Sequence, residues 1–120
     1  MSHPKSSIEI RKAKATRLNY AEFVDSMNVT SKMGVDDLEH HALSLSSEVG
    51  EFAGKVLKQI YRGQRYTNEE YLSELGDVLF HVQAICNLFH ISLLDLAKGN
   101  HDKLQDRLSR GVLHGDGDNR

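Results

Sequence analysis

Apolar side chains recur at helical spacing along most of this chain. The two longest stretches cover residues 36–61 and 68–90, where apolar residues repeatedly lie three or four positions apart. A shorter stretch covers residues 19–28, and a fourth begins after Ser92. No run of alternating apolar and polar residues is long enough for a sheet, and short connections between long helices favour antiparallel neighbours. The pattern predicts an all-α fold, an antiparallel helical bundle of four to five helices that oligomerisation completes, because the apolar stripes are wide.

The boundaries of these helices are marked by residues suited to capping. Asn19 and Thr67 each precede a glutamate by three residues, which is the spacing of a capping box. Asp36 and Ser92 are good N-caps as well, each with an acid three residues later. Gly63 follows the second predicted helix and is expected to end it. These signals agree with the periodicity and support the same four helices.

The pattern also divides the chain into three segments. Residues 1–18 contain several Lys and Arg side chains and are expected to form a solvated basic arm. Residues 19–110 form the helical domain. Residues 111–120 are too rich in glycine for a helix, and we expect a tail that is either disordered or closes on a bound ligand.

Composition restricts the possible partners and location. A chain of 120 residues is one domain by length, and its net charge of −2 gives no general attraction to nucleic acid or anionic lipid. No run approaches the ~18 apolar residues of a membrane span, and the N-terminus lacks the apolar core of a secretory signal. The single cysteine, Cys86, is expected to be a buried thiol in a reducing compartment. We therefore expect a cytoplasmic protein with no nucleic-acid or membrane partner.

Two carboxylate pairs with equal spacing lie on the second and third predicted helices. In each pair the acids are three residues apart, on one helix face, and a glycine stands just before the second acid. Glycine inside a helix costs about 1 kcal/mol relative to alanine, and like charges at this spacing are mildly destabilising. The pairs are Glu48 with Glu51 and Glu74 with Asp77.

The repetition of this unfavourable arrangement favours a metal site. Four converging carboxylates supply the all-oxygen ligands that suit Mg²⁺ or Mn²⁺ rather than zinc. The glycines, Gly50 and Gly76, are expected to let a backbone or ligand come close. A solvated acidic face is the usual explanation of one such pair, but it explains two matching pairs less well.

The fourth predicted helix carries polar and basic residues that suit phosphate. Asn100, Lys103 and Arg107 lie within a narrow arc of the helix wheel. Lys and Arg near an acidic metal site neutralise phosphate oxygens, and Arg binds two oxygens at once. The alternative is that these cations only complement the dipole at the end of their helix.

Together these motifs resemble the MazG-like family of all-α nucleoside triphosphate pyrophosphohydrolases. The family pattern is Glu-x-x-Glu, a spacer, Glu-x-x-Asp, and then Asn-x-x-Lys-x-x-x-Arg, and this chain has its parts in that order over residues 36–120. The tail "RGVLHGDGDNR" is also similar to the ends of small family members. Ser47 is a departure, because many members have another acid at this position.

The resemblance implies an activity and a set of site residues. The four acids would hold Mg²⁺, with Mn²⁺ as a substitute, and the enzyme would cleave between the α and β phosphates to give a nucleoside monophosphate and pyrophosphate, in nucleotide-pool house-cleaning. Family members form dimers or dimers of dimers, which implies a homodimer or homotetramer. The catalytic and metal-binding residues would be Glu48, Glu51, Glu74 and Asp77. The substrate-binding residues would be Lys55, Asn100, Lys103, Arg107, Asp118 and Arg120.

Several alternatives stay open at this stage. A phosphoribosyl-ATP pyrophosphatase or a pyrimidine dNTPase of the same superfamily shares the metal motif, and a non-enzymatic helical interaction module would leave the acids in solvent. A ferritin-like di-iron site needs Glu-x-x-His motifs, and no histidine here has a glutamate three residues before it. The general base is one of the acids. His81, one turn beyond Asp77, is either a group that supports the metal ligands or a structural histidine.

Overall fold

The regular secondary structure of the described residues is entirely α-helical. The computed structural model describes residues 19–27 and 36–111, and within these ranges it contains four α-helices and no strand. The helices are α2 (Tyr20–Ser26), α3 (Asp37–Arg62), α4 (Asn68–Leu88) and α5 (Leu93–Ser109). The predicted all-α fold is therefore confirmed. The basic arm and the tail residues Asp116, Asp118, Asn119 and Arg120 lie outside the described ranges.

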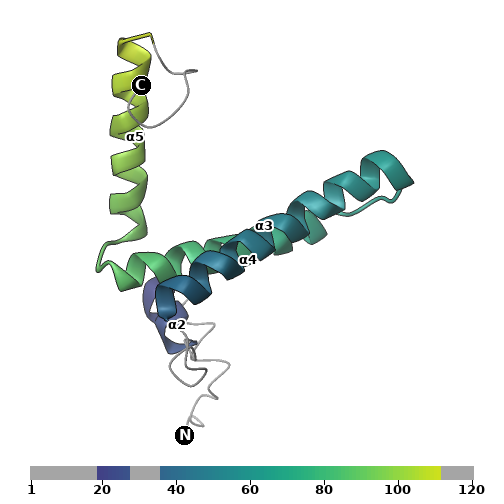
Figure 1. Ribbon diagram of the computed structural model, residues 1–120, viewed down its shortest axis with the longest axis horizontal. Helices are drawn as coiled ribbons and strands as arrows, with labels where there is room; N and C mark the ends of the chain where they lie inside the picture. The colour runs from purple at the N-terminus through teal and green to yellow at the C-terminus, as the bar shows by residue number, and fades with distance from the viewer. Residues whose placement is uncertain (1–18, 28–35, 112–120) are drawn as a thin grey trace, which may run out of the picture.

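Two long helices form the centre of the molecule. α3 and α4 pack side by side and antiparallel, and α2 packs against α4 at the end of the pair where α3 begins (Figure 1). The amide nitrogen Nδ2 of Asn87 on α4 donates to the carbonyl oxygen of Ala21 on α2, at 2.9 Å. α5 continues from the end of α4 after a bend of 96° and extends away from the α3–α4 pair (Figure 1). Within one chain, the antiparallel packing is therefore that of α3 and α4.

Three of the four expected N-caps form. The Asp36 carboxylate accepts from the backbone N–H groups of Leu38 and Glu39, and the Thr67 hydroxyl accepts from that of Glu70. Ser92 forms a complete capping box at the start of α5. These bonds satisfy backbone donors that the first turn of a helix leaves without a partner.

The capping box expected at Asn19 does not form. The backbone of Asn19 has ψ of 39°, outside the extended region that an N-cap normally adopts, and its side chain makes no capping bond. α2 therefore begins without a side-chain cap. Its position depends on its packing against α4 rather than on its own first turn.

Two residues in the left-handed region determine how the long helices end. Gly63 has φ of +66° and closes α3, as expected from its freedom at positive φ. α4 ends at Leu88, two residues earlier than predicted, and His90, which follows the C-cap Phe89, has φ of +55°. A non-glycine residue rarely adopts this conformation. The chain turns through it, and the N–H of Ile91 then bonds to the carbonyl oxygen of Cys86 at 3.1 Å.

The core is small and lies where α2, α3 and α4 meet. Val24 and Cys86 are each only 2% exposed, and Ala84 is also buried. The expected buried thiol is confirmed, and burial raises the pKa of Cys86. Elsewhere many large apolar side chains are exposed, among them Leu57, Ile60, Tyr61, Leu72, Leu75, Leu79, Leu94 and Leu108. That a second copy covers them stays a prediction.

Within the described residues, no single helix is both long and apolar enough to cross a membrane. α4 and α5 meet the length and composition limits only when they are taken together across their bend of 96°.

Candidate functional site

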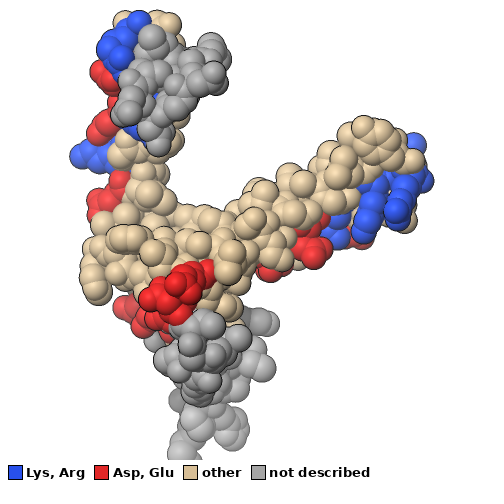
Figure 2. Space-filling model, viewed as in Figure 1, with Lys and Arg blue, Asp and Glu red and all other residues tan. Residues whose placement is uncertain are grey.

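Three of the four predicted metal ligands come together between α3 and α4. Glu48 extends from α3, and Glu74 and Asp77 extend from one face of α4, because residues three apart share a helix face. One carboxylate oxygen from each lies within 4.8 Å of the others. Figure 2 shows Asp and Glu side chains along the α3–α4 pair, whereas Lys and Arg gather at its far end, and both kinds are mixed on α5.

The electrostatics of this acidic group centre on Glu48. Partial burial raises the pKa of Glu48, and the nearby charges of Asp77, Glu74 and Glu51 raise it further. Like charges at short range disfavour the ionised form of each carboxylate. A divalent cation would relieve this repulsion.

Glu51 has a different position. It is exposed and lies one turn further along α3. Its charge affects Glu48, but its carboxylate does not belong to the group that the other three acids form within 4.8 Å. The role of Glu51 as a fourth ligand stays a prediction.

The chemistry of the donor set fits a hard divalent cation. All three groups are carboxylates, and Mg²⁺ prefers oxygen ligands at about 2.0–2.1 Å. Opposite ligands of such an ion are therefore about 4.2 Å apart, so oxygens spread over 4.8 Å need to move only slightly toward one another. Glu48, Glu74 and Asp77 are the residues that would hold the ion.

Lys55 lies at the edge of the acidic group. Its Nζ atom is 3.3 Å from an Oε1 atom of Glu74, and both side chains are largely buried. The same Nζ atom lies over the ring of Tyr66, at 4.8 Å from the ring centre. A lysine that was predicted to bind substrate is thus held beside a predicted metal ligand by two attractive contacts.

Sequence reasoning singled out His81 but missed its pairing with His41. The Nδ1 atoms of His41 on α3 and His81 on α4 are 3.0 Å apart, so one ring donates and the other accepts. Burial is the main cause that lowers the pKa of each, and the neighbouring His40 lowers both further. His41 is only 3% exposed. One feature of the sequence could have indicated that His41 lies on the side of α3 that carries the acids. His41 lies seven residues before Glu48, so both share a face of α3.

The predicted phosphate-binding residues of α5 are not brought to the acids within one chain. Asn100 and Lys103 are exposed and Arg107 is buried, all on a helix that leaves α4 at 96° (Figure 1). The physical reason is the turn at His90, which redirects the chain after α4. These residues can therefore bind a substrate at the acids only if a second copy of the chain brings its α5 there. Their role in substrate binding stays a prediction.

The interior glycines are not in close contact with other parts of the same chain. A Cβ atom added at Gly50 or Gly76 would meet nothing within 4 Å. The expected close approach thus does not occur among the described residues. If the glycines do allow a close approach, the approaching group is a ligand or a second chain.

Comparison with known proteins agrees with this geometry. The MazG nucleotide pyrophosphohydrolase domain matches residues 37–111, which contain all four acids and the α5 residues. The chain is also similar to the Gene 37 protein of Mycobacterium phage L5, at 35% identity over 91 residues, which are 72% of this chain and 79% of the phage protein. No solved structure matches the chain. With the domain match covering more than half of its length, the chain belongs to the MazG nucleotide pyrophosphohydrolase family.

Proposed function

We propose that this protein is a Mg²⁺-dependent nucleoside triphosphate pyrophosphohydrolase that cleaves an NTP or dNTP between its α and β phosphates. The products would be a nucleoside monophosphate and pyrophosphate. The observation that carries the proposal is the group of three carboxylates, contributed by two helices, inside the matched family domain. A role in clearing unwanted nucleotides from a cytoplasmic pool is the part that rests on family membership alone.

The residues around the acids have distinct proposed roles. Glu48, Glu74 and Asp77, with Glu51 one turn away, would hold Mg²⁺, or Mn²⁺ in its place. When bound, the ion would supply an activated water and neutralise phosphate charge. One of the carboxylates would act as the proton acceptor. Lys55, already within 3.3 Å of Glu74, would contact a phosphate oxygen next to the acids.

The proposal includes a homo-oligomer, as a dimer or a dimer of dimers. Exposed apolar residues lie on α3, α4 and α5, and Leu72, Leu75 and Leu79 line one apolar groove along α4. α5 points away from the acids of its own chain. A second copy that packs on the apolar groove would cover it, and could also bring Lys103 of one chain near the acids of the other.

The direct test is product analysis. The purified protein is incubated with Mg²⁺ and a panel of NTPs and dNTPs, and monophosphate plus pyrophosphate is separated from diphosphate plus phosphate. The expected result is monophosphate and pyrophosphate from at least one nucleotide, with no release when EDTA is present. Diphosphate plus phosphate would refute the proposed cleavage position. No release from any nucleotide, including phosphoribosyl-ATP, would favour a non-enzymatic helical interaction module.

A further inference from the structure

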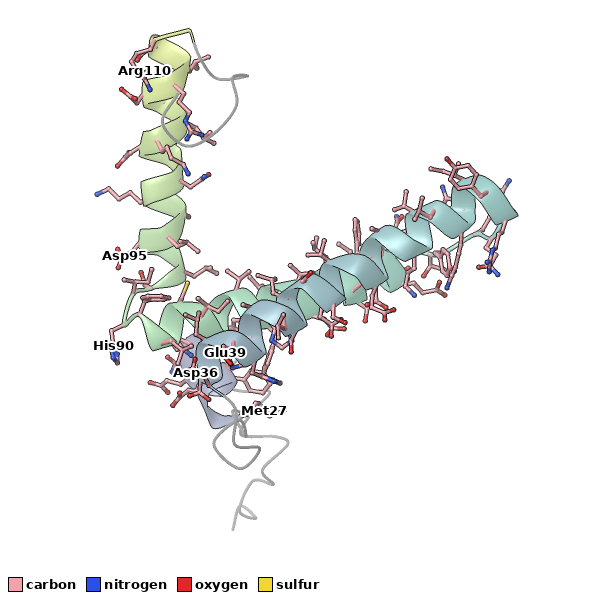
Figure 3. The ribbon with its side chains drawn as sticks, viewed as in Figure 1. Met27, Asp36, Glu39, His90, Asp95 and Arg110 are labelled. Atoms are coloured by element: carbon pink, nitrogen blue, oxygen red, sulfur yellow. The ribbon has the colours of Figure 1, made fainter. Side chains whose placement is uncertain are left out.

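A pocket of about 260 Å³ lies at the end of the α3–α4 pair where α2 packs. Residues of all three helices line it, and its volume is near the lower limit of ~300 Å³ for small-molecule sites. Figure 3 places the end of α2, the start of α3 and the corner at His90 together at this end. Among the lining residues are Val24, Asp25, Asp37, His41, Asn87 and His90.

This pocket lies in line with the acidic group. His41 lines the pocket and precedes Glu48 by seven residues, which is two helical turns, or about 10.5 Å along the same face of α3. α2 also extends from the acidic group to the pocket. Tyr20 lies near enough to Asp77 for that charge to raise its pKa, although burial is the larger cause, and Val24 of the pocket is one turn further along α2. The distance between the pocket and the acidic group suits a nucleotide whose α-phosphate lies at the acids and whose base, on the other side of the ribose, lies in the pocket.

The charges of the pocket decide which part of a nucleotide it can take. Its two acidic side chains, Asp25 and Asp37, form no hydrogen bond or ion pair with any other described residue. Two carboxylates repel phosphate, so the pocket cannot hold the triphosphate end. As acceptors without a donor, they suit a ligand that presents N–H groups.

Two of the other polar side chains of the pocket, those of Asn87 and His41, are already engaged. The amide of Asn87 donates to the carbonyl oxygen of Ala21 and accepts from Gln83. The Nδ1 atom of His41 is paired with that of His81, and the lowered pKa keeps the His41 ring neutral near pH 7. The two carboxylates and the ring of His90 are thus the polar groups left to contact a ligand, and of these the carboxylates are the anionic acceptors.

We propose that this pocket binds the nucleobase and selects bases that carry an exocyclic amino group, with Asp37 as the main determinant; the inference rests on the proposed function for the identity of its ligand. Cytosine and adenine present N–H₂ donors where thymine and uracil present a carbonyl oxygen. A carboxylate accepts from the amino group and repels the carbonyl. The matched comparison is dCTP against dUTP, because ring size, sugar and phosphates are the same and the bases differ only in the C4 substituent and in the hydrogen carried by N3. The proposed preference for cytosine therefore requires that the carboxylate faces the C4 substituent.

The test measures kcat/KM for dCTP and dUTP in the presence of Mg²⁺. A hydrogen bond to a charged group corresponds to a preference for dCTP of about tenfold to a hundredfold. In Asp37→Asn the side chain can also donate to the uracil carbonyl, and the preference is expected to fall to within about threefold. Glu39→Gln is the control, since it removes the same charge from the same helical turn at an exposed position that does not line the pocket. Equal turnover of dCTP and dUTP by the unaltered protein, or an unchanged preference in Asp37→Asn, would overturn the proposal.

A second measurement separates this inference from the proposed function. Cytidine and uridine, which carry no phosphate, are titrated into the metal-free protein while the imidazole signals of His41 and His101 are followed by NMR. Cytidine is expected to shift the signal of His41 and to leave that of His101, which is exposed on α5, unchanged. If no nucleotide is hydrolysed, the proposed function fails, yet this shift still identifies a base site. If cytidine leaves His41 unchanged, the pocket is not a base site, whatever the enzyme hydrolyses.

Discussion

The two ends of the α3–α4 pair have similar apolar periodicity but very different packing. At one end α2 adds a third layer, and Val24, His41 and Cys86 are almost completely buried. At the other end no third described helix is present, and Leu57 and Leu72 are 53% and 63% exposed. A helical repeat of apolar residues therefore indicates which face needs cover, but not whether the chain itself provides it. The predictions below test this contrast, beginning with the acids that lie between the two ends.

The largest expected effect comes from the acidic group. Glu48→Gln should lower Mg²⁺-dependent turnover by about 10²-fold to 10³-fold, because it removes the carboxylate that faces both acids of α4. Without metal the variant should be slightly more stable than the unaltered protein, since one repelling charge is gone. Turnover assays and urea denaturation with and without Mg²⁺ measure both effects. Glu69→Gln, at an exposed position in the first turn of α4, is the control.

An unchanged turnover rate in Glu48→Gln would show that these carboxylates only face solvent. A loss of turnover together with a loss of stability would instead show that Glu48 supports the fold. The two results are distinguished by the urea midpoint of the metal-free variant.

The next effect compares the two ends directly. Val24→Ala should reduce the free energy of unfolding by about 2 kcal/mol, from two lost methyl groups and an incompletely filled cavity. The loss should be the same at every protein concentration. Leu72→Ala should act mainly through association, so its effect should grow as the protein becomes more concentrated. Urea denaturation over a hundredfold range of concentration, with sedimentation measurements, separates the two.

A concentration-independent loss in both variants would mean that the exposed end is not an interface. A negligible effect of Val24→Ala would show that the packed end contributes little to stability. Either result would remove the contrast between the two ends.

A smaller effect is expected at the turn that closes the exposed end. Gly63 has φ of +66°, so Gly63→Ala should cost about 1 kcal/mol of stability. Gly54→Ala is the matched control inside α3, where an added Cβ meets nothing within 4 Å. That change should stabilise the helix by up to about 1 kcal/mol. The midpoint of thermal denaturation should fall in Gly63→Ala and rise in Gly54→Ala. A rise in Gly63→Ala would contradict the assigned turn.

The smallest effect is the pH dependence of the packed end. The pKa values of His41 and His81 are lowered in the folded protein, so the unfolded chain binds more protons between those values and about 6.5. Stability should therefore be full above about pH 6.5 and fall as the pH drops below it. In His81→Gln this slope should be shallower, whereas His101→Gln at an exposed position should leave it unchanged. Urea midpoints between pH 5 and 7.5 provide the measurement, and identical slopes in all three proteins would exclude the histidine pair as the cause.

Much of the fold was predictable because its signals are local. Periodicity and the caps at Asp36, Thr67 and Ser92 gave helix boundaries within about two residues of those observed. The direction of α5 was not predictable in this way. It depends on the short connection over residues 89–92, including the positive φ of His90, which no periodic pattern records. The missing cap at Asn19 has a similar cause, since tertiary packing and not its own side chain positions α2.

The candidate site was predictable to the extent that it follows from helical spacing. Glu74 and Asp77 share a face of α4 for this reason, and the antiparallel packing of α3 brings Glu48 to them. The contact between His41 and His81 joins positions 40 residues apart and depends on the register of one helix against the other. The pocket at the packed end likewise requires three helices. Contacts of this kind have no signature in the local sequence.

The ion pair between Lys55 and Glu74 gives the acidic group an internal counterion. A cation that takes up Glu74 has to compete with an ammonium group 3.3 Å away. Because Coulomb attraction scales with charge, a divalent ion overcomes this competition far better than Na⁺ or K⁺ does. If the acids hold a divalent ion as proposed, the exchange would release the ammonium group from Glu74 beside that ion. The lysine would then act against monovalent ions in the metal-free protein and be available to an anion after a divalent ion binds.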